Sequence, residues 1–95
     1  MNKITYTEHL KLRLKVRKIP KEYPAKIYEN PEQKFFDNVE QRHIAVKKLY
    51  YNKKMRNMMI VYDENEGFAE IVTIHPISDE KIVNRVISGR WIKNE

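Results

Sequence analysis

The sequence predicts an α+β domain in which two N-terminal helices precede a four-stranded antiparallel meander and a third helix follows it. Three observations lead to this prediction. Apolar residues between Phe35 and His75 recur with a period of two, which is typical of strands covered on one face. Short segments rich in turn-forming residues separate the apolar stretches, as in an antiparallel meander. Ser78 precedes an apolar stripe at helical spacing and is a suitable N-cap for the last helix.

The first helix is assigned to residues 8–18, where two signals conflict. Apolar and basic residues alternate through this segment, which is the period of a strand. Leu, Lys and Arg are nevertheless good helix formers. Thr5-x-x-Glu8 is a capping-box pattern and Thr7 is a second N-cap candidate. A short strand over residues 2–6 fits the pattern before the cap. For residues 8–18, the residues alone do not decide between a helix and a strand.

The later elements follow from prolines, turns and apolar spacing. Pro20 suits the first turn of a second helix, and Asn30-Pro31 ends it. Gly89 is a suitable residue to end the last helix, and Trp91 is expected to fold back onto the sheet. The four expected strands begin at Phe35-Phe36 and then span residues 43–51, 55–62 and 68–75.

Length and charge limit the class of protein and its partners. The 95 residues fit a single domain over 1–95, with a net charge of +6. All of this excess lies in residues 1–50, because residues 51–95 hold seven basic and seven acidic side chains. The segment His9–Lys21 is the most basic and contains no acid. A concentrated positive field attracts nucleic acid or an acidic protein, although a solvated Lys-rich face would have the same composition.

The composition also argues against several kinds of site. Cys is absent and only two glycines are present, so thiolate zinc sites and a phosphate-binding glycine loop are not expected. The three histidines are far apart in sequence and lack metal-ligand spacing. We therefore expect no metal and no cofactor. The first residues lack the apolar core of a secretory signal and no segment approaches about 20 apolar residues, which favours a cytoplasmic protein without membrane contact.

The remaining polar residue types suit cleavage of RNA without metal. This reaction needs a base, an acid and cations that stabilise the phosphorane, and His and Arg side chains can supply them. On a helix, His9, Arg13 and Arg17 would share one face; on a strand, Thr73 and His75 would share one face. The first set is also what a solvated basic helix face looks like. The second is equally compatible with a capped strand end beside Pro76.

Several short motifs resemble a group of small uncharacterised prokaryotic proteins. The matching residues are Thr7-Glu8-His9-Leu10, then Arg13 and Arg17-Lys18-Ile19, and then Tyr28-Glu29-Asn30-Pro31. The strand end Ile71-Val72-Thr73-Ile74 is similar to a "V-T-V/I" pattern of the group. The tail Asn84-Arg85-Val86-Ile87-Ser88-Gly89-Arg90-Trp91 resembles an ending found in a subset.

This resemblance implies a helical first segment and a RelE-like fold, in the group of barnase-like, EndoU-like and RelE-like ribonucleases. Many of these are toxins paired with antitoxins, so RNA and an acidic antitoxin protein are the implied partners. The implied function is that of a metal-independent ribonuclease of toxin–antitoxin type. The residues assigned to catalysis are His9, Arg13, Thr73 and His75, and those assigned to nucleic-acid binding are Lys11, Lys15, Arg17, Lys18, Arg85 and Arg90.

Whether the chain is an enzyme is left open by the sequence, as is its oligomeric state. A non-catalytic nucleic-acid-binding module would have the same basic first half and would bind RNA with strong salt dependence. A basic interaction protein that docks an acidic partner is a third interpretation. Cleavage, binding without cleavage, and co-purification with an acidic protein distinguish the three.

Overall fold

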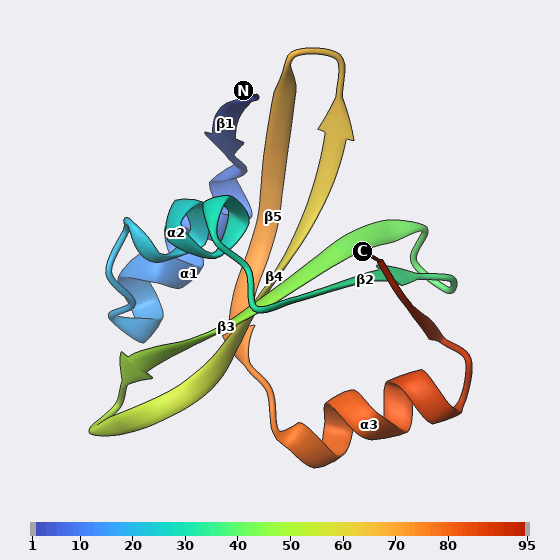
Figure 1. Cartoon of the computed structure of the whole chain (residues 1–95). Coiled ribbons are helices and arrows are strands. Elements are labelled where there is room, and N and C mark those ends of the chain that lie inside the picture. The colour runs from blue at the N-terminus through green and yellow to red at the C-terminus, as the bar shows by residue number, and fades with distance from the viewer. Residues whose placement is uncertain (1, 95) are drawn as a thin grey trace.

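A computed structural model describes residues 2–94 and shows a six-stranded mixed sheet with helices on both faces (Figure 1). A strand comes first, followed by two helices, four consecutive strands, a third helix and a short strand. In chain order the elements are β1 (Lys3–Tyr6), α1 (Glu8–Arg17), α2 (Tyr23–Glu29), β2 (Gln33–Asp37), β3 (Arg42–Tyr51), β4 (Lys54–Asn65), β5 (Phe68–Pro76), α3 (Asp79–Ile87) and β6 (Trp91–Lys93).

The sheet corrects the expected architecture. Strands β2 to β5 do form an antiparallel meander, but the strand order is β1-β5-β4-β3-β2-β6. β1 adds to one edge in parallel with the first half of β5, and β6 adds to the other edge antiparallel to β2. The prediction of a four-stranded antiparallel sheet was therefore wrong. The short strand expected over residues 2–6 is present as β1, but its place in the sheet was not predicted, because both added strands pair with segments distant in sequence. β6 is too short to show a strand period of its own.

The alternating segment near the N-terminus forms α1. The Thr7 hydroxyl accepts a hydrogen bond from the Leu10 amide at 3.1 Å, which caps the first turn. The helix ends at Arg17, and the C-cap residue Lys18 has a φ of 54°, which stops further helical hydrogen bonding. Its alternating apolar residues divide between opposite sides, so that Leu10 and Leu14 are buried whereas Leu12 and Val16 are exposed. The strand-like period thus belongs to a helix with apolar residues on two sides.

The last helix begins at its expected cap, whereas α2 begins at Tyr23 and not at Pro20, which lies outside the helix. α2 has Pro24 in its first turn, where the missing amide hydrogen is not needed. In α3 the Ser78 hydroxyl accepts a hydrogen bond from the Lys81 amide at 3.1 Å. Gly89 follows this helix with a φ of +81°, which a residue without Cβ adopts easily. Trp91 is buried on the sheet as expected, but as part of β6.

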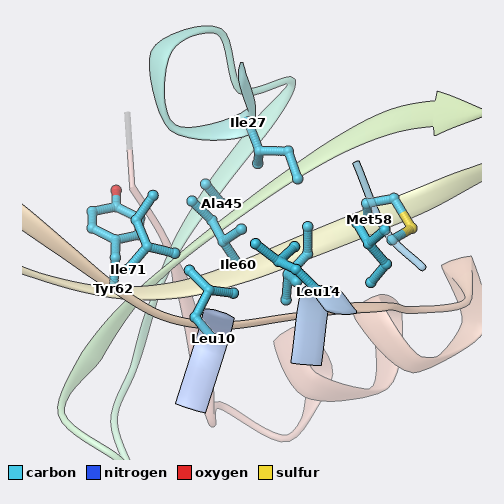
Figure 2. Close-up of a cluster of buried hydrophobic side chains, with 10 residues drawn as sticks. Leu10, Leu14, Ile27, Ala45, Met58, Ile60, Tyr62 and Ile71 are labelled. Carbon is cyan, nitrogen blue, oxygen red and sulfur yellow. The ribbon is translucent and has the colours of Figure 1, made fainter. Parts of the chain in front are cut away.

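Two apolar clusters lie on opposite faces of the sheet. We call the face under α1 and α2 the α1 face and the face under α3 the α3 face. Neighbouring strand residues alternate between them, so Ile60 packs on the α1 face and Met59 on the α3 face. The α1-face cluster shown in Figure 2 comprises Leu10, Leu14, Ile19, Ile27, Ala45, Met58, Ile60, Tyr62, Ile71 and Ile74. The α3-face cluster comprises Phe35, Ile44, Val46, Met59, Ile77, Ile82 and Trp91.

Candidate functional site

A cavity of about 250 Å³ lies between α3 and the α3 face of the sheet. Its apolar floor is formed by side chains of β3, β4 and β5 together with Trp91. Its polar walls come from both ends of the sheet, from α3 and from the loop after it. The polar residues that line it are Asp37, Glu40, Arg42, Thr73, His75, Lys81, Arg85 and Arg90.

His75 is the titratable base of this cavity. Its Nδ1 lies 3.2 Å from the carbonyl oxygen of Pro76. A carbonyl only accepts, so this contact favours the tautomer with hydrogen on Nδ1 and leaves the Nε2 lone pair free to take a proton. Burial lowers the pKa of His75, and the positive charges of Arg13, Lys81 and Arg17 lower it further, against an opposing effect of the Pro76 carbonyl. The imidazole is therefore uncharged at neutral pH.

Asp37 at the end of β2 organises one wall of the cavity. Its buried carboxylate accepts hydrogen bonds from the amides of Val39 at 2.8 Å and Glu40 at 3.0 Å. It also accepts from Trp91 Nε1 at 3.1 Å and forms an ion pair with the Arg90 guanidinium at 3.2 Å. Burial alone would raise the pKa of Asp37, but the hydrogen bonds from Glu40, Arg90, Val39 and Trp91 lower it. The carboxylate is therefore ionised at neutral pH and fixes the Arg90 side chain against the sheet.

The turn after Asp37 is also tied to the segment that follows α3. The Asn38 amide donates to the Arg90 carbonyl at 2.8 Å, and the Asn38 side-chain amide donates to the Gly89 carbonyl at 3.2 Å. These bonds and the ion pair join two loops that are about fifty residues apart in sequence. The cavity wall that carries Arg90 is thus held by backbone as well as side-chain contacts.

Thr73 lies beside His75 on the same face of β5, because it is two residues away on a strand. Its Oγ1 is buried and has no hydrogen-bond partner within residues 2–94. The Nε of Arg13 on α1 is likewise buried and unpartnered in this part of the chain. Buried polar groups normally find partners, so both atoms are unusual. In the case of Thr73, a ligand oxygen in the cavity would supply one.

The four residues assigned to catalysis do not form one cluster. Thr73 and His75 line the cavity, as their spacing on β5 predicts. His9 is exposed on α1 and lines a separate shallow groove with Arg13 and Arg17. Arg13 approaches His75 closely enough to lower its pKa but does not line the cavity. The expected combination of His9 with Thr73 and His75 is therefore not a single site in this structure.

The residues assigned to nucleic-acid binding fall into two groups. Arg85 and Arg90 line the cavity. Arg17 and three lysines are exposed on α1 or at its C-terminal end, on the other side of β5 from α3; these lysines are Lys11, Lys15 and Lys18. Lys11 pairs with Glu8 at 3.1 Å, an exposed contact that contributes little to stability.

The third histidine lies away from the cavity. His43 is on the α1 face, where its ring stacks on Tyr62 with centroids 5.3 Å apart and meets the edge of Phe36. Across residues 2–94 there is no group of three or more His, Cys, Asp or Glu side chains placed to hold a metal ion.

Sequence reasoning missed half of the cavity wall. Asp37, Glu40, Arg42 and Lys81 all line it, yet none was singled out from the sequence. The pairing of β2 with β3 and β6 brings Asp37 beside Arg42 and Arg90, and no local spacing encodes that pairing, whereas Lys81 comes from α3. The only available signal was an acid, Asp37, directly after the two phenylalanines at which the first strand was expected to begin.

No family model matches this chain, and neither the curated proteins nor the solved structures contain a match to it. The resemblance to small uncharacterised prokaryotic proteins with a RelE-like fold therefore stays a prediction. Within the described residues, no helix is long and apolar enough to cross a membrane.

Proposed function

We propose that this protein binds RNA in the cavity under α3 and cleaves its phosphodiester backbone without metal, with His75 moving the proton. One observation carries the proposal. An uncharged imidazole with a lowered pKa lies in a cavity whose walls also carry Lys81, Arg85 and Arg90. A titratable base held beside several cations is the arrangement that transfer of a phosphoryl group requires.

The proposed step is an attack of the ribose 2′-hydroxyl on the adjacent phosphorus. His75 Nε2 accepts the 2′-hydroxyl proton as the new P–O bond forms. The resulting imidazolium returns this proton to the 5′-oxygen as the old P–O bond breaks. The products are a 2′,3′-cyclic phosphate and a free 5′-hydroxyl, so protons and charge balance with a single acid–base group.

The cavity walls supply the charge stabilisation that this step needs. Arg85 and Lys81 make no ion pair within residues 2–94, so their charges are available to the non-bridging phosphate oxygens. The unpartnered hydroxyl of Thr73 can donate to one of these oxygens. Arg13 and Arg17 lie outside the cavity and would hold neighbouring phosphates of a longer strand.

The test is RNA cleavage by purified protein in EDTA, comparing His75→Ala with His9→Ala. Cleavage by the wild type that falls at least about a hundredfold in His75→Ala but less than about threefold in His9→Ala supports the proposal. Circular dichroism confirms that both variants are folded. Cleavage that disappears in EDTA, or that survives in folded His75→Ala, contradicts it.

Binding of RNA without cleavage is the second candidate. It is favoured by the fact that His75 is the sole histidine lining the cavity within the described chain, since His9 and His43 lie elsewhere. In that case RNA affinity falls linearly with salt on logarithmic axes, and no cyclic phosphate forms. Replacement of Arg85 by Ala would weaken binding in both cases, so only product analysis separates them.

The acidic protein partner expected from the resemblance would have a different docking place. Leu12 and Val16 are about two-thirds exposed on the outer side of α1, where they line one groove with Arg13 and Arg17. Exposed apolar residues that share a groove with cations suit an acidic amphipathic segment. We propose α1 as the surface for such a partner if the protein has one.

A further inference from the structure

We propose that the cavity under α3 selects a monoanionic phosphodiester over a dianionic phosphomonoester, and that Asp37 and Glu40 set this preference. The inference rests on the proposed function, because it assumes that a phosphate group occupies the cavity. It adds the class of phosphate that fits. It also assigns a role to two acids in a cavity otherwise lined by cations.

The positive charges of the cavity are largely neutralised already. The Arg90 guanidinium is bound by the Asp37 carboxylate through Nε and one Nη, each about 3.2 Å away. Arg42 is paired with Asp63 at 3.5 Å. Neither arginine therefore offers a full uncompensated charge to a ligand.

The charges that remain amount to a single positive unit. Lys81 and Arg85 line the cavity without an ion-pair partner in residues 2–94, and Glu40 lines it as an unpaired carboxylate. His75 is uncharged at neutral pH and adds nothing to this balance. One bound monoanion neutralises the groups that line the cavity; Arg13 and Arg17, whose charges reach His75, lie outside this lining on α1.

A second negative charge on the ligand would have no net attraction to compensate its desolvation. The floor of the cavity is apolar, formed by Ile44, Met59 and Val61 beside Trp91, so screening by water is weaker there than at the surface. The second charge would also face the carboxylates of Asp37 and Glu40. An internal phosphate of an RNA strand carries one charge, whereas a terminal phosphate carries nearly two above a pKa of about 6. The cavity therefore favours internal positions over strand ends.

The direct test compares two ligands that differ by one methyl group. Thymidine 3′-monophosphate is a dianion at pH 8, and its 3′-methylphosphodiester is a monoanion that lacks a 2′-hydroxyl and cannot be cleaved. Dissociation constants are measured by calorimetry on the whole chain at low salt. We expect the methyl diester to bind about tenfold more tightly than the monoester, because the second negative charge of the monoester is not compensated in the cavity.

Two variants and a control assign the preference to the acids. Asp37→Asn and Glu40→Gln each remove one negative charge with little change in shape, and each should reduce the preference to about threefold or less. Glu66→Gln, in the exposed loop between β4 and β5, should leave the tenfold preference unchanged. If Asp37→Asn does not fold, Glu40→Gln alone tests the role of the acids. Glu40 is exposed and makes no ion pair in the described structure, so this variant removes a negative charge without breaking a contact that holds the fold.

The outcomes separate this inference from the proposed function. Equal affinity, or tighter binding of the monoester, overturns the preference. If binding in that case is still weakened by Arg85→Ala, the cavity remains a phosphate site and the proposed function stands. A preference that both acid variants retain in full overturns the role of Asp37 and Glu40. If neither ligand binds, both the inference and the proposed function fail.

Discussion

Replacement of Asp37 by Ala should destabilise the protein far more than replacement of any exposed acid. The carboxylate accepts hydrogen bonds from two backbone amides and from Trp91 Nε1, and it pairs with Arg90. Trp91 is 3% exposed, so its indole hydrogen would lose its partner without gaining water. A buried donor left unpaired costs about 1–3 kcal/mol, whereas the two amides, beside exposed residues, regain water more easily. The partly exposed Arg90 adds a smaller loss, which gives about 3 kcal/mol in all.

Urea unfolding followed by fluorescence measures this loss, because Trp91 is the single tryptophan of the chain and contacts Asp37 directly. Asp63→Ala is the matched control: its pair with Arg42 at 3.5 Å is solvent-exposed and should be worth no more than about 0.5 kcal/mol. The pKa of Asp37 is lowered in the folded state, so its contribution is complete above the unfolded pKa of about 3.9 and declines as pH falls through the folded pKa. The difference between wild type and Asp37→Ala should therefore be full at pH 6 and narrow below about pH 4. Equal losses for the two variants at pH 6 would refute this account of the cavity wall.

Three further predictions concern the core, His75 and the first helix. Ile60→Ala, at a fully buried site on the central strand β4, should lower the free energy of unfolding in urea by about 3 kcal/mol. Ile92→Ala, on the exposed side of β6, should lower it by less than about 1 kcal/mol. Similar losses for the two variants would show that the α1-face cluster is not the main core. An NMR titration should give His75 a pKa below 6.5, because burial and nearby positive charges disfavour the imidazolium. The rate of RNA cleavage by this base should fall as the pH drops through the same pKa. A pKa at or above 6.5 would contradict the described burial and charge environment. Thr7→Ala should lower stability by about 1 kcal/mol, because the Thr7 hydroxyl accepts a hydrogen bond from the Leu10 amide and donates one to a carbonyl of β5. Thr7→Ser keeps the hydroxyl and should retain most of this stability in thermal unfolding. Equal losses for the two variants would assign the effect to the threonine methyl group.

The local signals predicted the last helix, whereas for residues 8–18 they left helix and strand open and only the family resemblance implied a helix. A hydroxyl at Thr7 or Ser78 caps a helix whatever the rest of the chain does, and Gly89 ends one through its own backbone conformation. Capping even outweighed the strand-like alternation of residues 8–18, because leucines at alternate positions can occupy two sides of a helix. The strand-like alternation of apolar residues in this segment, despite its high helix propensity, therefore reflects the apolar residues that are exposed on the outer side of α1.

The sheet edges could not be predicted because they depend on pairing between distant segments. β1 joins β5 across more than sixty residues, from Lys3 opposite Phe68 to Tyr6 opposite Ile71. β6 is only three residues long, and what places it on β2 is the burial of Trp91 against Phe35, with ring centroids 5.2 Å apart. Neither partner could be identified from the composition of these short segments. The two errors removed both edges from the expected sheet while leaving its central meander intact.

The same pairing explains why half of the cavity was missed. Thr73 and His75 could be placed on one face because a strand alternates within itself, and that part of the site needs no knowledge of its neighbours. Asp37 acquires its role only when β6 lies beside β2, since Asp37 is then opposite Trp91 in register and within reach of Arg90. The charge balance of the cavity depends on this contact: without it Arg90 would be a free cation and the site would suit a dianion. The edge strand absent from the predicted sheet is therefore also the element on which the proposed selectivity for a phosphodiester depends.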